Sequence, residues 1–339
     1  MNPPDPNALS VTFLGTSSGV PTRQRNVSAL ALQLPQRAET WLLDCGEATQ
    51  HQILRHPDLN ASQIRRIFIT HMHGDHIYGL PGLLATCGMS GRPEAMDIYG
   101  PPGLEDYLKG VIRYSDTHLH YPIQVHTVET GLILQEAEYS VYCAPLDHRV
   151  VAFGYRIVEH DRTGSFDVAK AEAHGIPFGP LYGRLKAGEQ VTLPDGRILD
   201  GRDYVGSPQI GRKLAYCTDT TYCRNAVDLA RAADLLIHEA TYAQVDLALA
   251  QRSKHSTAMM AAQVAAEAKA QTLILTHFSP RYHKEAAITL EDLQAEAQTL
   301  FPHTLIAQDR LTYPVPRRLP PQPVTSLATD PSGKRSQIF

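Results

Sequence analysis

The sequence predicts a mixed α/β fold of the α+β type, in which two β-sheets pack back to back with helices on their outer faces. In both the first and the last hundred residues, short runs that are apolar or alternate between apolar and polar residues precede segments with helical spacing. We interpret these runs as strands. This order favours two sheets over one parallel sheet. In addition, 43% of the 339 residues are hydrophobic and 19% are charged, which is typical of a globular chain that buries a core without disulfides.

The first half of the chain is expected to consist mainly of strands. Runs bounded by Gly, Pro and charged residues predict an opening β-meander over 11–14, 29–33 and 41–43. Residues 67–69 form a strand that ends in a histidine-rich loop, and 78–89 has the apolar spacing of a helix. Further strands are expected at 96–99, 123–125, 132–134, 139–142 and 151–155.

Strands and helices alternate in the last third of the chain. We expect strands at 214–216, 235–237, 272–275 and 304–306, the last being the final strand of the chain. Helices are expected at 226–233, 257–270 and 290–300, of which the second is rich in alanine.

Two segments differ in character from the rest. Residues 159–204 contain few branched apolar residues and many Gly and Pro, which predicts a flexible arm that packs poorly. Residues 314–339 are rich in proline and predict a disordered tail. The main domain is therefore expected to cover 1–313 and to include the arm.

Composition excludes several classes of protein. No apolar run approaches the ~18 residues that a membrane span needs, and the N-terminus lacks the basic and apolar regions of a secretory signal. We therefore expect a cytoplasmic protein that does not contact membranes. The five cysteines are scattered and never spaced as C-x-x-C, so they are expected to be reduced core residues. The net charge of −4 provides no general attraction to nucleic acid.

The segment Thr70–His76 carries four residue types that bind metals. His71 and His73 lie two apart on an extended backbone, so both rings point to the same side and can share one cation. Asp75 and His76 are adjacent, so their side chains diverge and more naturally serve a second ion. Imidazole and carboxylate ligands suit Zn²⁺ and tolerate Mn²⁺ or iron.

Two ions need further ligands, and the best candidates lie at the ends of later strands. His148, Asp219 and His277 each follow an apolar run. Taken singly, each is as readily a hydrogen-bonded or surface residue as a ligand. A sandwich would nevertheless bring all three to one rim.

His-x-His-x-Asp-His after an apolar strand resembles the signature of the metallo-β-lactamase superfamily. The resemblance implies a four-layer αββα sandwich with metals at the sheet edge. Within that superfamily, the chain is similar to the tRNase Z (ribonuclease Z) family, endonucleases that mature the 3′ ends of tRNA. The similarity extends over about residues 11–312.

Several separate motifs carry this resemblance. The loop 19–26 is similar to the family's Pro-x-Lys-x-Arg-Asn motif, with Arg23 where Lys is commoner. Segments 238–241 (His-Glu-Ala-Thr) and 255–257 (His-Ser-Thr) are similar to motifs that distinguish the family from lactamases. The remaining matches are Phe13-Leu-Gly-Thr16, Leu43-Asp-Cys-Gly-Glu47 and the Gly-Pro motif of the tRNA-binding arm at 175–183.

The resemblance implies two Zn²⁺ per subunit, with Mn²⁺ as an alternative. It assigns His71, His73 and His148 to one ion, Asp75, His76 and His277 to the other, and Asp219 to both. Asp44 is placed to support the metal loop, and Asp75 is also the proton acceptor.

The general acid is expected to be His255, oriented by Glu239 or His238, because histidine can hold a proton near neutral pH. The alternative is that Ser256 or Thr257 caps the alanine-rich helix and that His255 is merely exposed.

The implied substrate is precursor tRNA, cleaved to leave a tRNA 3′-hydroxyl and a trailer 5′-phosphate by a homodimer. Its expected contacts are Arg23, Arg25, Asn26, Gly179, Pro180, Arg184 and Lys186. Charge alone does not make the arm an RNA binder, because residues 155–202 hold seven basic and seven acidic residues.

Two other functions remain open from the sequence. One is a superfamily phosphodiesterase or arylsulfatase-like hydrolase of small esters, and the other is a non-catalytic RNA-binding protein with a structural metal.

Overall fold

The computed structural model describes residues 9–317, which form two compact units. We call residues 9–160 with 211–317 the main unit, and residues 161–210 the arm. The main unit contains all seven residues expected to bind metal.

The first sheet has seven strands in the order β16-β1-β2-β3-β4-β5-β6. The pairs β1–β2 and β2–β3 are antiparallel, which confirms the predicted meander. From β3 to β6 the pairing is parallel, so the ends of these strands point to the same edge. The strands are β1 (Ser10–Gly15), β2 (Ala29–Leu34), β3 (Glu39–Leu43), β4 (Ile64–Phe68), β5 (Met96–Gly100), β6 (Ile123–Thr127) and β16 (Thr312–Pro314).

The second sheet also has seven strands, in the order β15-β14-β13-β12-β9-β8-β7. Strands β12 to β15 are parallel, whereas β7, β8 and β9 pair antiparallel. Its strands are β7 (Gly131–Gln135), β8 (Tyr139–Pro145), β9 (Phe153–Glu159), β12 (Lys213–Cys217), β13 (Leu235–Glu239), β14 (Thr272–Thr276) and β15 (Thr304–Ile306).

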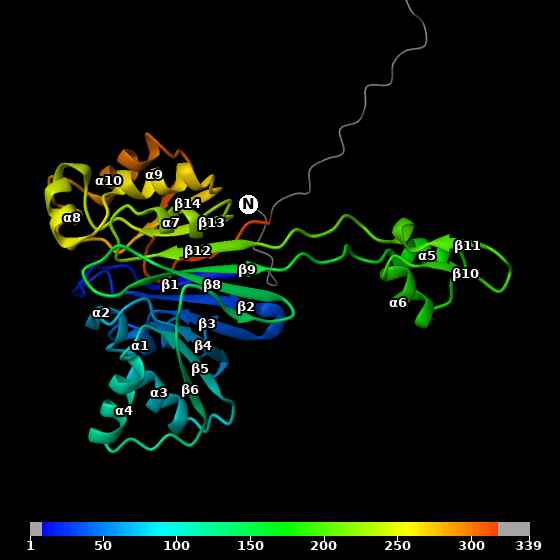
Figure 1. Ribbon diagram of the computed structural model, residues 1–339, viewed down its shortest axis with the longest axis horizontal. Helices are drawn as coiled ribbons and strands as arrows, with labels where there is room; N and C mark the ends of the chain where they lie inside the picture. Colours follow the sequence, from blue (N-terminus) through cyan, green and yellow to red (C-terminus); the bar gives the residue numbers. More distant parts are fainter. Residues whose placement is uncertain (1–8, 318–339) are drawn as a thin grey trace, which may run out of the picture. The chain divides into compact units, whose positions relative to one another are not determined.

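Figure 1 shows the two sheets face to face, with α1, α3 and α4 outside the first and α7, α9 and α10 outside the second. This arrangement confirms the predicted sandwich. The sheets meet through a buried cluster around Trp41, Phe68 and Tyr155, while alanines of α9 face the second sheet. The helices are α1 (Thr49–Leu54), α2 (Gly74–Ile77), α3 (Leu80–Met89), α4 (Leu104–Tyr114), α7 (Arg224–Leu229), α8 (Leu247–Ser253), α9 (Ala258–Ala268) and α10 (Leu290–Gln298).

In the main unit, the sequence did not predict α1, α2, α4, α8 or β16. Strand β16 hydrogen-bonds to β1 and includes Pro314, which an edge strand tolerates because one side of it has no partner strand. Val315 is buried as well. Thus 304–306 is not the final strand, and residues 314–317 belong to the main unit rather than to a tail. The rest of the predicted tail, 318–339, lies outside the described residues.

The arm has its own secondary structure: α5 (Val168–Ala173), α6 (Pro180–Lys186), β10 (Gln190–Thr192) and β11 (Ile198–Asp200). Its small core consists of Ala171, Ile176, Tyr182, Leu185, Val191 and Tyr204. The expectation of poor packing was therefore wrong, because two tyrosines supply the buried surface that branched residues usually provide.

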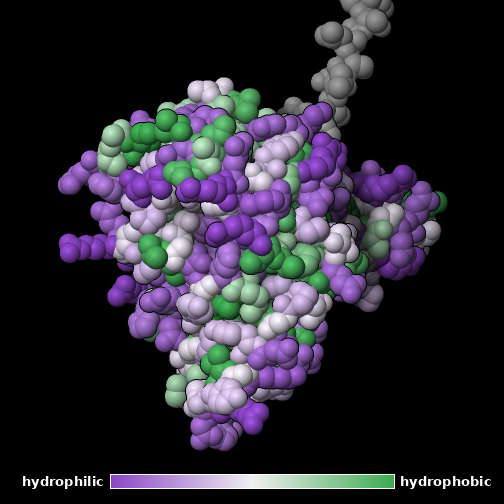
Figure 2. Space-filling model, turned by 60° about the vertical axis from the view of Figure 1, so that its left-hand side comes forward, coloured by the Kyte–Doolittle hydropathy of each residue, from purple (hydrophilic) through white to green (hydrophobic). Residues whose placement is uncertain are grey.

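The side chains of Cys45, Cys87, Cys143 and Cys217 are buried and Cys223 is partly buried; all five thiols are free, as expected. In the part of the chain that the structure describes, no helix has the length and apolar character of a membrane span. On the face shown in Figure 2, hydrophobic residues form small groups among hydrophilic ones.

Candidate metal centre

The seven candidate ligands come together in the main unit, at the edge where the parallel strands end. His71 and His73 follow β4, Asp219 follows β12 and His277 follows β14. His148 comes from the connection between β8 and β9. Because the ends of parallel strands meet at one edge, residues distant in sequence become neighbours there.

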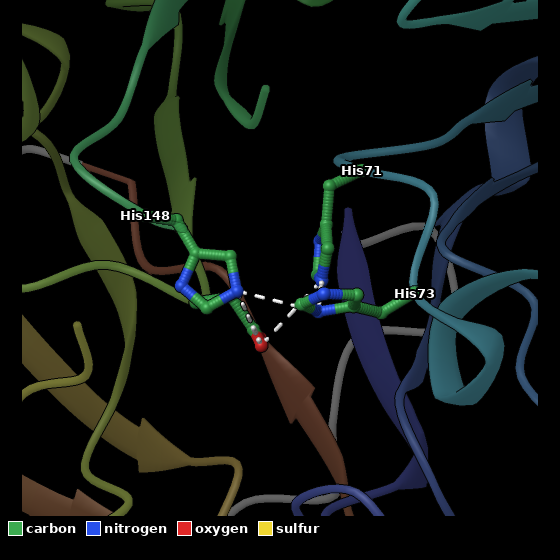
Figure 3. Close-up of side chains that lie close together, drawn as sticks. His71, His73 and His148 are labelled. Atoms are coloured by element: carbon green, nitrogen blue, oxygen red, sulfur yellow. Dashed lines mark hydrogen bonds and ion pairs between the residues drawn. The ribbon is translucent and has the colours of Figure 1, made fainter. Parts of the chain in front are cut away.

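One group contains His71, His73, His148 and Asp219. The His73 Nδ1 atom lies 3.0 Å from His71 Nε2 and 3.3 Å from His148 Nε2. Asp219 Oδ2 lies 3.6 Å from His71 Nε2 and 3.9 Å from His148 Nε2. Figure 3 shows His148 approaching from the side opposite His71 and His73, with the three rings converging.

A second group contains Asp75, His76 and His277. Asp75 Oδ2 is 3.5 Å from the Nε2 atoms of both histidines. The other oxygen of Asp219, Oδ1, lies 3.2 Å from His76 Nε2 and 3.1 Å from His277 Nε2. Asp219 therefore presents one carboxylate oxygen to each group.

Four of these histidines have their Nδ1 atom engaged by the protein. His76 Nδ1 is 2.8 Å from Asp44 Oδ2, and His148 Nδ1 is 3.0 Å from the Lys254 carbonyl. The Nδ1 atoms of His71 and His277 lie 3.0 Å from the hydroxyls of Thr70 and Thr241. Each of these contacts orients the ring and directs Nε2 into the shared space.

These residues fit a pair of divalent cations. The Nε2 atoms of His76 and His277 are buried and have no hydrogen-bond partner. Buried polar atoms without a hydrogen-bond partner are rare in proteins, and here both nitrogens face the carboxylate oxygens of Asp75 and Asp219. A set of imidazoles and carboxylates without thiolate is suited to Zn²⁺ and to Mn²⁺.

The electrostatics favour the metal-binding forms of most of these groups. The exception is His76: burial would lower its pKa, but the carboxylates of Asp219, Asp44 and Asp75 raise it. Burial lowers the pKa of His71, His73 and His148, which keeps these rings neutral. Burial by itself would raise the pKa of Asp75 and Asp219, but the adjacent histidines bring both well below their usual range. Neutral imidazoles and ionised carboxylates are the states in which these groups ligate a cation.

Asp44 supports this cluster from behind. It is buried and has a left-handed backbone, with φ +60°. Its carboxylate accepts hydrogen bonds from the Thr70 N–H, the Thr70 hydroxyl, His76 and the Tyr216 hydroxyl. The location agrees with the role expected for Asp44.

Glu239, at the end of β13, orients His255. Its Oε1 atom lies 2.8 Å from His255 Nδ1, and its other oxygen accepts from the Ser256 N–H. Burial lowers the pKa of His255, but the Glu239 charge outweighs burial and raises it to about 9. The ring centroid of His255 lies 5.0 Å from that of His148, so His255 borders the metal cluster and is 9% exposed.

His238 does not share this position. Side chains along a strand alternate between its two faces. Because Ile237 lies in the core between the sheets and Leu236 packs on the helix side, His238 faces the outer helices. Its Nδ1 atom contacts the Glu239 carbonyl, and its Nε2 atom is buried without a partner. Of the two expected orienting residues, the structure therefore selects Glu239. Thr257 does cap α9, so capping and a buried His255 coexist.

Comparison with known proteins agrees with this geometry. Family models described as "Anti-Pycsar protein Apyc1" and "Beta-lactamase superfamily domain" match residues 9–160 and 154–278. The ribonuclease Z of Acaryochloris marina is 62% identical over 310 residues, which is 91% of this chain and 98% of that protein. The ribonuclease Z of Nostoc sp. is 58% identical over 313 residues, 92% of this chain and 97% of its own. The chain belongs to the ribonuclease Z family.

Solved structures agree with membership of the ribonuclease Z family. The short form of human tRNase Z is 29% identical, with a TM-score of 0.64 over 91% of this chain and 100% of that one. A diphosphatase of the PhnP family matches at 20% identity, with a TM-score of 0.56 over 92% of this chain and 99% of its own. At that identity the likeness shows the fold alone.

Two residues expected to bind substrate make hydrogen bonds within the protein. Arg25 Nη1 donates to the Thr16 hydroxyl and the Ala307 carbonyl, and its guanidinium lies over the Phe278 ring. Asn26 is buried; its N–H donates to Asp309 and its side chain to the Glu47 carbonyl. These contacts shape the loop; Asn26 is buried, whereas Arg25 remains partly exposed.

Arg23 is exposed. It lines a cavity of about 640 Å³ together with Arg25, Phe278 and Lys284. Phe278 directly follows the candidate ligand His277, so this cavity borders the metal cluster.

The expected tRNA contacts in the arm lie around α6. Pro180 is the first residue of α6 and Gly179 precedes it. Arg184 and Lys186 are exposed in its last turn, where Arg184 pairs with Glu189 at 2.8 Å.

The residues that orient the ligands were only partly foreseen. Thr70 and Thr241 lie inside recognised motifs but received no role, and the Lys254 carbonyl was not considered. A backbone carbonyl has no signature in the sequence, since every residue has one.

Proposed function

We propose that this chain is an endoribonuclease that removes the 3′ trailer from precursor tRNA, leaving a tRNA 3′-hydroxyl and a trailer 5′-phosphate. One observation carries the proposal: Asp219 presents one oxygen to each of two groups of ligands. We infer that His71, His73 and His148 hold one Zn²⁺, that Asp75, His76 and His277 hold another, and that Asp219 contacts both. The similarity to ribonuclease Z proteins supports the same activity.

A pair of divalent cations would supply Lewis-acid activation of water and stabilise the charge that develops at phosphorus. Side chains of the protein accept and donate the protons of the reaction. Asp75 Oδ2, held by the Gly19 N–H at 2.9 Å, accepts the proton of the attacking water. His255 holds its Nδ1 proton against Glu239, so Nε2 donates its proton to the leaving 3′-oxygen.

Substrate contacts extend beyond the metal cluster. Arg23, Arg25 and Lys284 line the bordering cavity and are proposed to contact backbone phosphates near the cleaved bond. In the arm, Gly179, Pro180, Arg184 and Lys186 are proposed to contact the tRNA backbone, whose A-form shape needs no base reading. We propose further that the enzyme is located in the cytoplasm and forms a homodimer. Sedimentation of the purified protein would test the homodimer.

The decisive experiment incubates metal-loaded protein with a 3′-extended precursor tRNA and maps both product ends. We expect a single cut, a 3′-hydroxyl on the tRNA and a 5′-phosphate on the trailer. Asp75→Ala should abolish cleavage while tRNA binding remains. Binding without cleavage by both proteins would instead support a non-catalytic RNA-binding protein.

A further inference from the structure

Lys254 ends α8 in an unusual backbone conformation. Its φ of +58° and ψ of 47° lie in the left-handed region, which glycine usually occupies at helix ends. The N–H of the next residue, His255, donates to the Ala250 carbonyl at 2.9 Å. The Lys254–His255 peptide group is therefore anchored to α8 at its nitrogen, and its carbonyl oxygen is directed elsewhere.

The Lys254 carbonyl oxygen contacts the ring of His148. The His148 Nδ1 atom lies 3.0 Å from it. A carbonyl can only accept, so Nδ1 must carry the ring proton and Nε2 must carry the lone pair. Nε2 is the atom that faces His73 and Asp219.

A second contact joins the same two loops. Lys254 Nζ donates to Asp147 Oδ1 at 2.6 Å, and both side chains are a little under half exposed. An ion pair with this exposure stabilises a protein only slightly. Nevertheless, it connects the residue before His148 to the residue before His255.

We propose that Lys254 is a positioning residue: its left-handed backbone presents the carbonyl that selects the metal-binding tautomer of His148, and the same peptide group places His255. The inference rests on the function proposed above, because it assigns His148 to a metal ion. It implies that metal binding and the placement of His255 depend on one backbone conformation.

Substitutions that change the free energy of the left-handed conformation at Lys254 test this proposal. Lys254→Val disfavours the left-handed region, because the side chain is β-branched, whereas Lys254→Gly favours it. We expect Lys254→Val to weaken binding of one of the two Zn²⁺ equivalents by about tenfold. Lys254→Gly should bind both within about threefold of wild type, although it lacks the ion pair, which contributes little.

Lys269 offers a matched control. It ends α9 with φ +53° and ψ 43°, so Lys269→Val carries the same backbone strain away from the metal cluster. It should lower stability much as Lys254→Val does and leave both zinc affinities unchanged. Affinities would be measured by competition with a chromophoric chelator.

The visible spectrum of the Co²⁺-substituted protein provides a second readout, because it reports the geometry of the ligands directly. We expect it to change in Lys254→Val and to be unchanged in Lys254→Gly and Lys269→Val. Wild-type affinities and spectrum in Lys254→Val would overturn the inference. An equal loss in Lys254→Val and Lys254→Gly would also overturn it, by pointing to the ion pair. Failure of the wild-type chain to bind two ions would overturn the proposed function itself.

Discussion

At the scale of single residues, the site depends on groups outside the set of seven candidate ligands. Asp44, Thr70, Thr241 and the Lys254 carbonyl each engage the Nδ1 atom of one histidine. Because each histidine has two nitrogens, a partner on one of them decides which form the other presents. Loss of such a partner should therefore weaken metal binding without removing a ligand.

Asp44→Asn tests this at His76. The amide cannot replace a carboxylate that accepts four hydrogen bonds, so we expect zinc affinity to fall about 10- to 100-fold. Asp97→Asn is a matched control, because Asp97 on β5 also pairs with a histidine, His126 on the edge strand β6, and neither belongs to the metal cluster. Equal zinc affinity in wild type and Asp44→Asn, measured by chelator competition, would contradict the role given to Asp44.

His255 should affect catalysis rather than metal content. We expect His255→Ala to lower the rate constant for precursor tRNA cleavage by about 100-fold or more, as loss of a general acid does. Two metal ions per chain should remain, as measured by elemental analysis. Thr257→Ala removes the cap of α9 nearby and serves as the control, with a loss of stability of about 1 kcal/mol and little loss of rate. A His255→Ala variant that keeps wild-type rates would remove His255 from the mechanism.

At the scale of elements, a buried ion pair joins the two strands from which the arm departs. Glu159 is the last residue of β9, and Arg212 precedes β12. Arg212 Nε lies 2.7 Å from Glu159 Oε2, and both residues are buried. Burial raises the pKa of Glu159, but hydrogen bonds and the charge of Arg212 outweigh burial and leave this pKa below its usual value.

This pair gives a prediction about pH. Because the folded-state pKa of Glu159 is depressed, the pair stabilises the protein above the unfolded value of about 4.5, and this contribution is lost as pH falls through the folded value. At pH 7, Glu159→Gln should lower the free energy of unfolding by about 3 kcal/mol. The difference from wild type should shrink below pH 4.5 in urea titrations of metal-free protein.

An exposed pair provides the control for this experiment. Glu105 and Lys109 pair on the surface of α4, and such pairs contribute little. Glu105→Gln should therefore leave stability unchanged at both pH values. A Glu159→Gln defect of the same size at pH 7 and pH 3.5 would refute the titration of Glu159 as its cause.

At the scale of the whole molecule, the arm and the metal cluster belong to separate compact units. The backbones of Arg162 and Gln209 exchange two hydrogen bonds of 2.9 Å. These residues are close enough for a short Gly-Ser linker to replace 163–208. The arm also has its own core, so its removal should leave the main unit folded.

Deletion of 163–208 distinguishes the two enzymatic hypotheses, an endonuclease for precursor tRNA and a hydrolase of small esters. We expect cleavage of precursor tRNA to collapse, because phosphate contacts are lost, while hydrolysis of a small phosphodiester such as bis(p-nitrophenyl) phosphate survives. Affinity of the full chain for tRNA should fall steeply with salt, as measured by filter binding. Unchanged tRNA cleavage by the deleted form would contradict the role given to the arm. A full chain that hydrolyses the small phosphodiester as well as the deleted form does, and cleaves no tRNA, would favour a hydrolase of small esters.

Metal removal should affect the stability of the whole fold. Ligands that bind only the folded state stabilise it by mass action, by about 4 kcal/mol at a thousand times Kd. We therefore expect a chelator to lower the thermal midpoint of the wild-type chain and to leave Asp219→Ala nearly unaffected. An identical midpoint with and without chelator in wild type would argue against tight binding at this cluster.

Local sequence patterns determined most strands of the main unit, the meander and the types of residue at the site. Alternation and apolar runs report burial at the level of a few residues, and ligand chemistry belongs to the side chain itself. His71, His73, Asp75 and His76 lie within one short segment, so their proximity could be anticipated from spacing alone.

Tertiary structure alone decided the remainder. Packing against β1 made 312–314 a strand, and two tyrosines gave the arm a core. The burial of Asn26, the choice of Glu239 over His238 and the role of the Lys254 carbonyl depend on contacts between segments far apart in sequence. Such contacts leave no periodic signal, because they arise only once the two sheets have brought their loops together.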